Sequence, residues 1–398
     1  MPTLTNPLIR QSFARPFVAM ALIIGLAGCS AEVEQEPGIV LAAIYNLNGT
    51  QSHLDGPSSF GVRLAVDEAN AAGGVNGLPV NLVVADGTTD EEVVFQRAES
   101  LFNHFPQVSA VIGLSDTDMV GAGAPIVADH GVMFVTSGAT SPRLPTKAPG
   151  FLYLACFGDN IQAAAGAEFA WNTLSARKVA VLFNEDMSYT QLLHQYFGAR
   201  FSELGGEVVN IQPYNETTLH NAVNRLANGE LGDADLIYLA AGPGEVVQAL
   251  AQLRRSGIDT PVLGGDGLDI GGSWQQLPVS DVYFTTHAYL GDDNPDPQVV
   301  AFKAAYAAAY PDHQADAFSA LGYDTARLVM QAIENAGSEE PMAVRDALGQ
   351  IKNFEGITGT ISYGPSQYVP TKSVSIIAIN KGVQSLAQEL MPQSVPAP

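Results

Sequence analysis

The chain has 398 residues, 46% of them hydrophobic, and carries 18 Lys and Arg against 41 Asp and Glu, a formal net charge of −23. This length is sufficient for two domains with cores of their own, and the hydrophobic content excludes a globally disordered chain. The acidic excess argues against nucleic acid as a partner, because binding phosphates requires a basic surface.

The N-terminal segment has the pattern of an export signal. Arg10 and Arg15 precede an apolar run over residues 17–28. This run is too short to cross a bilayer as a helix, which takes about 20 apolar residues, and residues 1–28 are therefore predicted to be a signal peptide. Small residues stand directly before Cys29, which resembles the lipobox of bacterial lipoproteins and makes Cys29 the expected lipidation site. The alternative is an ordinary signal peptide followed by a chance cysteine.

An acidic segment, residues 29–38, contains few apolar side chains and is interpreted as a tether. After it, strand and helix patterns alternate. Continuous apolar runs predict strands over 39–45, 80–85, 110–114 and 132–136. Helical spacing of apolar residues predicts helices over 61–72, 91–105 and 119–130.

The same plan repeats from about residue 159. Helices are predicted over 161–174, 190–204, 218–227 and 245–256, and strands over 178–183, 207–213, 236–240 and 261–264. This repetition predicts an α/β fold with two doubly wound lobes, each a parallel sheet covered by helices on both faces. A strand near 282, helices over 298–310, 318–336 and 343–348, and strands over 359–363 and 373–380 follow. The last residues, 389–398, are Pro-rich and expected to form a disordered tail.

Catalytic and cofactor signatures are mostly absent from the sequence. Gly242–Gly244 and Gly265–Gly267 begin like dinucleotide fingerprints but lack the third glycine, and no phosphate-binding loop or G-x-S-x-G motif occurs. The seven histidines are scattered without a metal-ligand spacing. Cys156 lies in an apolar run with no histidine nearby, which favours a buried, inert thiol over a nucleophile. We therefore expect no enzyme activity, no cofactor and no metal.

Polar residues follow four of the predicted strands. These segments are 115–118 and 137–141 in the first half of the chain, and 184–189 and 265–267 in the second half. In open α/β sheets, ligands bind outside the carboxyl ends of the strands, so a ligand that contacts all four segments has to lie between the lobes. The alternative is that these residues only cap helices and form turns.

Several stretches together resemble a known family. They are 65–79 (AVDEANAAGGVNGLP), 110–113 (AVIG), 138–142 (GATSP), 263–268 (LGGDGL), 317–325 (AFSALGYDT) and 358–363 (TGTISY). In this order and at these spacings, the chain resembles type I periplasmic binding proteins of branched-chain amino acid ABC transporters, over residues 38–388. The resemblance implies two Rossmann-like lobes joined by three crossovers near 157, 287 and 365. Residues 39–157 with 288–365 then form lobe 1, and residues 158–287 with 366–388 form lobe 2.

The resemblance also implies a head-group site for an amino acid. Thr117 and the loop of Gly138, Ala139 and Thr140 occupy the positions of a clamp on the α-carboxylate, which suits hydroxyl and backbone N–H groups near a helix start. Asp266 occupies the position of an acid that pairs with the α-ammonium group.

The side-chain half of the implied site departs from the family pattern. Tyr189 and Phe318 match aromatic wall positions, whereas Leu54 and Gly242 stand where leucine-binding members carry tyrosine. Asp116 stands where serine is usual. Unless neighbouring loops fill the space, the missing aromatic rings predict an enlarged cleft and a bulky ligand. Asp116 predicts a preference against acidic ligands, unless it is only an exposed helix cap.

The resemblance implies a lipid-anchored solute-binding protein, exported to the periplasm or cell surface and expected to be a monomer. It would capture an amino acid or a related small molecule between its lobes and deliver this ligand to an ABC permease. Two alternatives stay open. One is a receptor for an amide, a urea-type compound or a sensory ligand. The other is a secreted α/β hydrolase, which turnover of generic esters would reveal.

Overall fold

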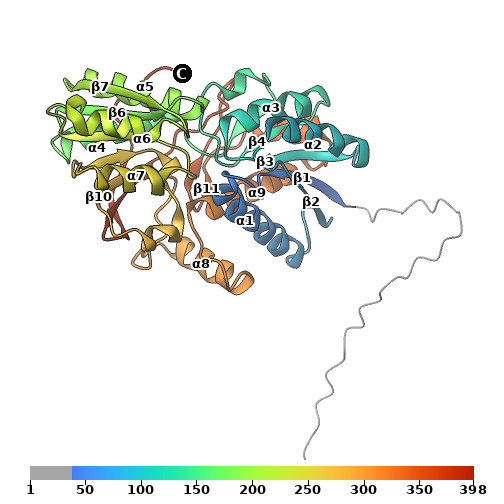
Figure 1. The fold of residues 1–398 in the computed structure, drawn as a ribbon. Coiled ribbons are helices and arrows are strands. Elements are labelled where there is room, and N and C mark those ends of the chain that lie inside the picture. The colour runs from blue at the N-terminus through green and yellow to red at the C-terminus, as the bar shows by residue number, and fades with distance from the viewer. Residues whose placement is uncertain (1–37) are drawn as a thin grey trace, which may run out of the picture. The chain divides into compact units, whose positions relative to one another are not determined.

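The computed structural model describes residues 38–398 (Figure 1). The predicted signal peptide, the predicted lipidation site Cys29 and the tether up to residue 37 lie outside these residues. Among the residues that the structure describes, none belongs to a helix long and apolar enough to cross a membrane.

The first lobe is built on a five-stranded parallel sheet with the order β2-β1-β3-β4-β5. Its strands are β1 (Ile39–Tyr45), β2 (Val80–Asp86), β3 (Val108–Gly113), β4 (Phe134–Thr136) and β5 (Leu152–Leu154). Its helices are α1 (Ser52–Ala71), α2 (Glu91–His104), α3 (Thr117–Asp129), α8 (Pro297–Ala309), α9 (Ala317–Ala336) and α10 (Pro341–Leu348). The short hairpin of β11 (Phe354–Gly356) and β12 (Gly359–Ile361) also packs on this lobe.

Both faces of this sheet are covered by helices. In β1, Leu41 and Ala43 pack with apolar residues of α1, α9 and α10, whereas Val40 and Ala42 pack with those of α2 and α3. Successive residues of a strand point to opposite faces, so every residue of β1 is buried. This explains why the strand has a continuous apolar sequence.

The second lobe is built on a seven-stranded sheet with the order β14-β13-β10-β9-β8-β6-β7. Its strands are β6 (Lys178–Asn184), β7 (Glu207–Tyr214), β8 (Leu236–Ala240), β9 (Val262–Gly264), β10 (Ser280–Thr286), β13 (Val374–Asn380) and β14 (Val383–Leu390). Strands β6 to β10 run parallel, and β13 and β14 join antiparallel at one edge. Its helices are α4 (Asp159–Asn172), α5 (Ser188–Glu203), α6 (Leu219–Arg225) and α7 (Val246–Arg255).

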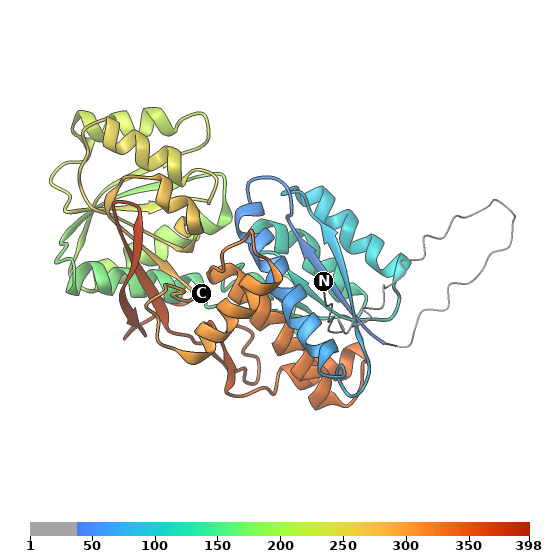
Figure 2. The same ribbon diagram turned by 90° about the horizontal axis from the view of Figure 1, so that it is seen from below.

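The chain passes between the two sheets three times, after β5, after β10 and after β12. Figure 2 shows the result: one lobe contains the blue to cyan and the orange segments, and the other contains the green to yellow and the red segments. Each lobe is thus assembled from chain segments that are far apart in the sequence.

Two expectations from the sequence are wrong. The first helix begins at Ser52 and not at residue 61, because Gly56 and Pro57 are weak helix formers that hide its first turns. The C-terminal residues are not disordered. The backbone N–H of Gln393 donates to Glu168 at 2.9 Å, and Asn160 donates to the carbonyl oxygen of Pro396 at 2.9 Å. These bonds hold the tail against α4, even though its composition is Pro-rich.

Candidate functional site

A narrow cavity of about 20 Å³ lies between the lobes, and we call it the interlobe cleft. Its lining comes from the loops and helix starts that follow six strands, three in each sheet. The first lobe contributes Gln51, Leu54, Ser115, Asp116 and Thr140. The second lobe contributes Met187, Tyr189, Gly242, Pro243, Asp266 and Gly267. The cleft therefore lies at the carboxyl ends of both sheets, where α/β proteins bind ligands.

The structure brings six of the residues singled out in the sequence together around this cleft. They are Leu54, Asp116, Thr140, Tyr189, Gly242 and Asp266. Four others do not line it. These are Thr117, whose buried hydroxyl has no hydrogen-bond partner among the described residues, and Gly138, Ala139 and Phe318, which lie behind the cleft.

Gly138 and Phe318 support the wall of the cleft from behind. A Cβ atom on Gly138 would lie 2.8 Å from the hydroxyl oxygen of Ser115 and 3.1 Å from a ring carbon of Phe318. Only glycine allows the loop after β4 to approach the loop after β3 so closely. The ring of Phe318 also meets the edge of His287, with 5.7 Å between the ring centroids.

Asp266 is fixed by three side-chain donors. Its Oδ1 accepts hydrogen bonds from Gln162 at 2.7 Å and from the Tyr189 hydroxyl at 2.8 Å, and its Oδ2 accepts one from His287 Nε2 at 3.0 Å. Gln162 is held in turn, because its Oε1 accepts from the backbone N–H of Asp266 and from the Thr285 hydroxyl. The carboxylate is thus preorganised, and its position does not depend on the ligand.

Burial sets the protonation of the groups around Asp266. Burial lowers the pKa of His287, so its ring is neutral at pH 7 and donates from Nε2. Burial, together with the charge of Asp266, raises the pKa of Asp159 to about 8. Asp159 is therefore mostly uncharged at neutral pH. Asp266 is the carboxylate of this group that faces the cleft.

Asp116 is both the N-cap of α3 and part of the cleft wall. Its Oδ1 accepts from the backbone N–H groups of Asp118 at 2.9 Å and Met119 at 3.1 Å, and its Oδ2 accepts from Gln51 Nε2 at 2.9 Å. The side chain is buried, not exposed, and burial raises its pKa to about 6. Asp116 thus caps α3, as one of the two interpretations of the sequence predicted, and it also faces the interlobe cleft.

The expectation of an enlarged cleft is wrong at Gly242. A Cβ atom on Gly242 would lie 2.9 Å from the sulfur of Met187, so Met187 already occupies the space that a larger side chain would fill. Leu54 is buried and lines the cleft opposite. The expectation of a bulky ligand therefore loses its support at Gly242.

A direct bond joins the lobes beside the cleft. The backbone N–H of Ser188, the first residue of α5, donates to Asp118 Oδ2 at 3.1 Å. A carboxylate from the first lobe therefore lies at the helix N-terminus of the second, where the helix dipole favours negative charge. This bond stabilises the closed arrangement of the lobes.

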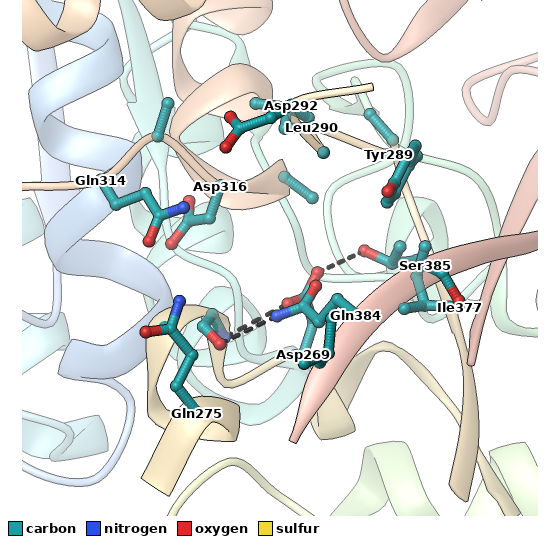
Figure 3. Close-up of a pocket in the computed structure, with 18 of the residues that line it drawn as sticks. Asp269, Gln275, Tyr289, Leu290, Asp292, Gln314, Asp316, Ile377, Gln384 and Ser385 are labelled. Atoms are coloured by element: carbon teal, nitrogen blue, oxygen red, sulfur yellow. Dashed lines mark hydrogen bonds between the residues drawn. The ribbon is translucent and has the colours of Figure 1, made fainter. Parts of the chain in front are cut away.

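A larger cavity of about 570 Å³ lies elsewhere, next to β13 and β14 (Figure 3). Figure 3 shows Asp269, Gln314 and Asp316 around it, with Gln384 donating to the carbonyl oxygen of Gly271. Its lining contains none of the predicted site residues. It lies beside the carboxyl end of β10 and the antiparallel strands β13 and β14, and we do not assign the ligand to it because the predicted site residues line the interlobe cleft.

Ser115, Met187 and Gly267 belong to the segments that the sequence predicted to face the ligand, although they were not named singly, and sequence reasoning missed Gln51 and Pro243. All except Gln51 lie in or next to polar or glycine-rich segments that follow predicted strands, so the rule about strand ends contains the signal for them. Gln51 follows β1, and the same rule applied to that strand would have found it. Among residues 38–398, no group of three or more His, Cys, Asp and Glu could hold a metal ion.

Comparison with known proteins identifies the family to which this chain belongs. The sequence model of the periplasmic binding protein family matches residues 38–384. The Leu/Ile/Val-binding protein homolog 3 of Brucella melitensis is 25% identical, over 92% of this chain and 96% of that protein. The leucine binding protein LivK of Thermotoga maritima has 27% identity and a TM-score of 0.78, covering 89% and 99% of the two chains.

A second solved structure, LivJ of Streptococcus pneumoniae in complex with isoleucine, has a TM-score of 0.80 at 24% identity and covers 90% of this chain and all of that one. It shows that the fold is shared. The proteins that resemble this chain are substrate-binding components of transporters. The chain belongs to the periplasmic binding protein family, as a type I solute-binding protein of the branched-chain amino acid transporter kind, and it is not an enzyme.

Proposed function

We propose that the chain captures an amino acid, or a closely related small molecule that carries an amino group, in the interlobe cleft. The observation that carries this proposal is Asp266, a carboxylate that three side-chain donors hold at the edge of a closed, two-lobed cavity. A fixed carboxylate in a desolvated cleft attracts an ammonium group. Thr140, on the opposite lobe, is placed to contact the remainder of the head group.

Binding works through an equilibrium between open and closed lobes. A ligand that contacts Asp266 on one lobe and Thr140 on the other gains its full binding energy only when the lobes are closed. It therefore shifts the population toward the closed form. The bond between Ser188 and Asp118 forms in that same closed arrangement and adds to its stability.

The closed form is the form that a transporter would recognise. Family membership implies export to the periplasm, and we propose that the loaded protein docks on an ABC permease as a monomer. We propose further that lipid on Cys29 holds the mature chain at a membrane. A single acyl chain binds membranes only marginally, so stable anchoring would require more than one chain.

A thermal-shift screen against all amino acids, their amides and small amines tests the capture of a ligand. A ligand at 100 times its dissociation constant adds about 2.7 kcal/mol to the free energy of unfolding, which raises the melting temperature by several degrees. A screen in which no such compound raises the melting temperature would contradict the proposal. Selective binding of urea-type compounds would favour the amide or urea receptor instead.

A further inference from the structure

The N-terminus of α3 points to the kind of ligand that the cleft selects. The first N–H groups of a helix form a ready site for an anion, such as the carboxylate of an amino acid. In this chain the carboxylate of Asp116 already takes the N–H groups of Asp118 and Met119, at 2.9 and 3.1 Å. The chain has thus filled this anion site with a negative charge of its own.

A second acceptor beside this site, the side-chain oxygen of Gln51, has no hydrogen-bond partner among the described residues. Asp116 Oδ2 accepts from Gln51 Nε2 at 2.9 Å, and this bond turns the other end of the amide, Gln51 Oε1, away from Asp116. That oxygen is buried. Gln51 and Asp116 both line the cleft. A ligand group that lies beside these two residues therefore meets oxygen atoms that accept hydrogen bonds.

The charge of the residues that line the cleft also disfavours a ligand carboxylate. Asp116 and Asp266 are its two acidic residues, and no Lys, Arg or His is among the residues that line the cleft. A ligand carboxylate next to Asp116 would lie in a buried site without a cation, which is costly. An NH2 group in the same place would donate to Asp116 Oδ2 and Gln51 Oε1 instead.

We infer that the cleft selects ligands whose carboxyl function is neutralised as a carboxamide, with Asp116 as the residue that determines this specificity. The inference deepens the proposed function and rests on it. The ligand ammonium group lies on Asp266, and the amide NH2 lies beside Asp116 and Gln51. Free amino acids bind more weakly, because their carboxylate faces these same acceptors.

Matched pairs of ligands test this inference by calorimetry. L-Leucine is compared with L-leucinamide, and L-phenylalanine with L-phenylalaninamide, at pH 7.5 and fixed ionic strength. We expect the wild-type protein to bind each amide at least about tenfold more tightly than its parent acid, the difference that one charge-assisted hydrogen bond makes. Tighter binding of the free acids by the wild-type protein would overturn the inference.

Three variants test whether Asp116 and Gln51 cause the preference for amides over free acids. Asp116→Ser keeps a good N-cap residue for α3 but removes the charge, and it should reverse the preference in favour of the free acid. Asp116→Asn keeps the size and the cap, and it should bring acid and amide within about threefold of each other. Gln51→Ala leaves the cap of α3 intact, and the Gln51 side chain makes no cap bond at the start of α1. It removes the second acceptor, so it should weaken the binding of the amide alone. An unchanged ratio in all three variants, with unaltered circular dichroism, would overturn the inference.

The same experiment separates the inference from the proposed function. If the wild-type protein binds the free acids and not the amides, the inference fails while the proposed function stands. If neither acids nor amides bind to the wild-type protein or to any variant, the proposed function fails, and the inference fails with it.

Discussion

Replacing Asp266 by asparagine is the most informative single change in the cleft. Asparagine keeps an oxygen that can accept from Gln162 and Tyr189, but its NH2 group then faces His287, which donates to Asp266 in the wild-type protein. His287 Nδ1 has no hydrogen-bond partner among the described residues. The ring can therefore move its proton to Nδ1 and accept from the new amide through Nε2, so we expect Asp266→Asn to fold.

The expected loss is one of affinity. Removing one charge of a buried, hydrogen-bonded pair commonly costs about 2–5 kcal/mol, or roughly 30- to 4,000-fold in the dissociation constant. We expect a loss in this range for every ligand that carries an ammonium group. The change in the free energy of unfolding should be smaller, at about 1 kcal/mol, because the three contacts of Asp266 persist in altered form. Asp266→Ala would be a poorer test, since it leaves three buried donors without a partner.

Calorimetry with the tightest-binding compound of the screen measures this loss, and urea denaturation measures the stability. Asp269→Asn is a matched control, because Asp269 is also a buried acid of the second lobe but lines the other cavity. The control should retain wild-type affinity. If Asp266→Asn binds as tightly as the wild-type protein, Asp266 does not contact the ligand and our reasoning about the head group is refuted.

Four further predictions concern Asp118, Asp116, the C-terminal tail and Cys29. Asp118→Asn should weaken the binding of all ligands alike, by about fivefold, because it loosens the bond to Ser188 that favours the closed lobes; a change in ligand selectivity would argue against this role. Affinity for L-leucinamide should rise from pH 5 to pH 7, because Asp116, whose pKa is about 6, ionises and becomes a stronger acceptor for the amide NH2 group. Asp55, with a pKa of about 7, titrates in the same range, so a profile that Asp116→Asn leaves unchanged would exclude Asp116 as the source. Deleting residues 391–398 should lower the free energy of unfolding by about 1–3 kcal/mol, because Glu168 loses the N–H groups of the tail; unaltered urea denaturation would show that the tail contributes nothing. Cys29→Ser should release the protein from membranes into the soluble exported fraction, and a variant that still sediments with membranes would contradict lipid anchoring.

The sequence was most informative where the fold requires a local pattern. Buried parallel strands such as β1 are continuous apolar runs, and the segments that follow β3 and β9 are polar, so the fold and the acids Asp116 and Asp266 could be predicted. Residues that act through contacts between distant parts of the chain could not be predicted from the sequence. Met187 fills the space beside Gly242, but the two lie on loops after different strands, and their meeting depends on the order of strands in the sheet.

Two other features were hidden for physical reasons. Composition alone predicts disorder for the Pro-rich tail, whereas its order depends on Glu168, a buried carboxylate that Arg200 holds at 2.6 Å and that also accepts from the tail. The helix start at Ser52 was obscured by Gly56 and Pro57. As a result Gln51, which directly precedes this helix, was not recognised as a residue of the site.

A crystal structure of the protein with the tightest-binding compound of the screen would show which cavity the ligand occupies. We predict that the compound lies in the interlobe cleft and contacts both lobes, with its ammonium group on Asp266 and its opposite polar end beside Asp116. A compound found in the larger cavity of Figure 3, or bound to one lobe alone, would contradict the account.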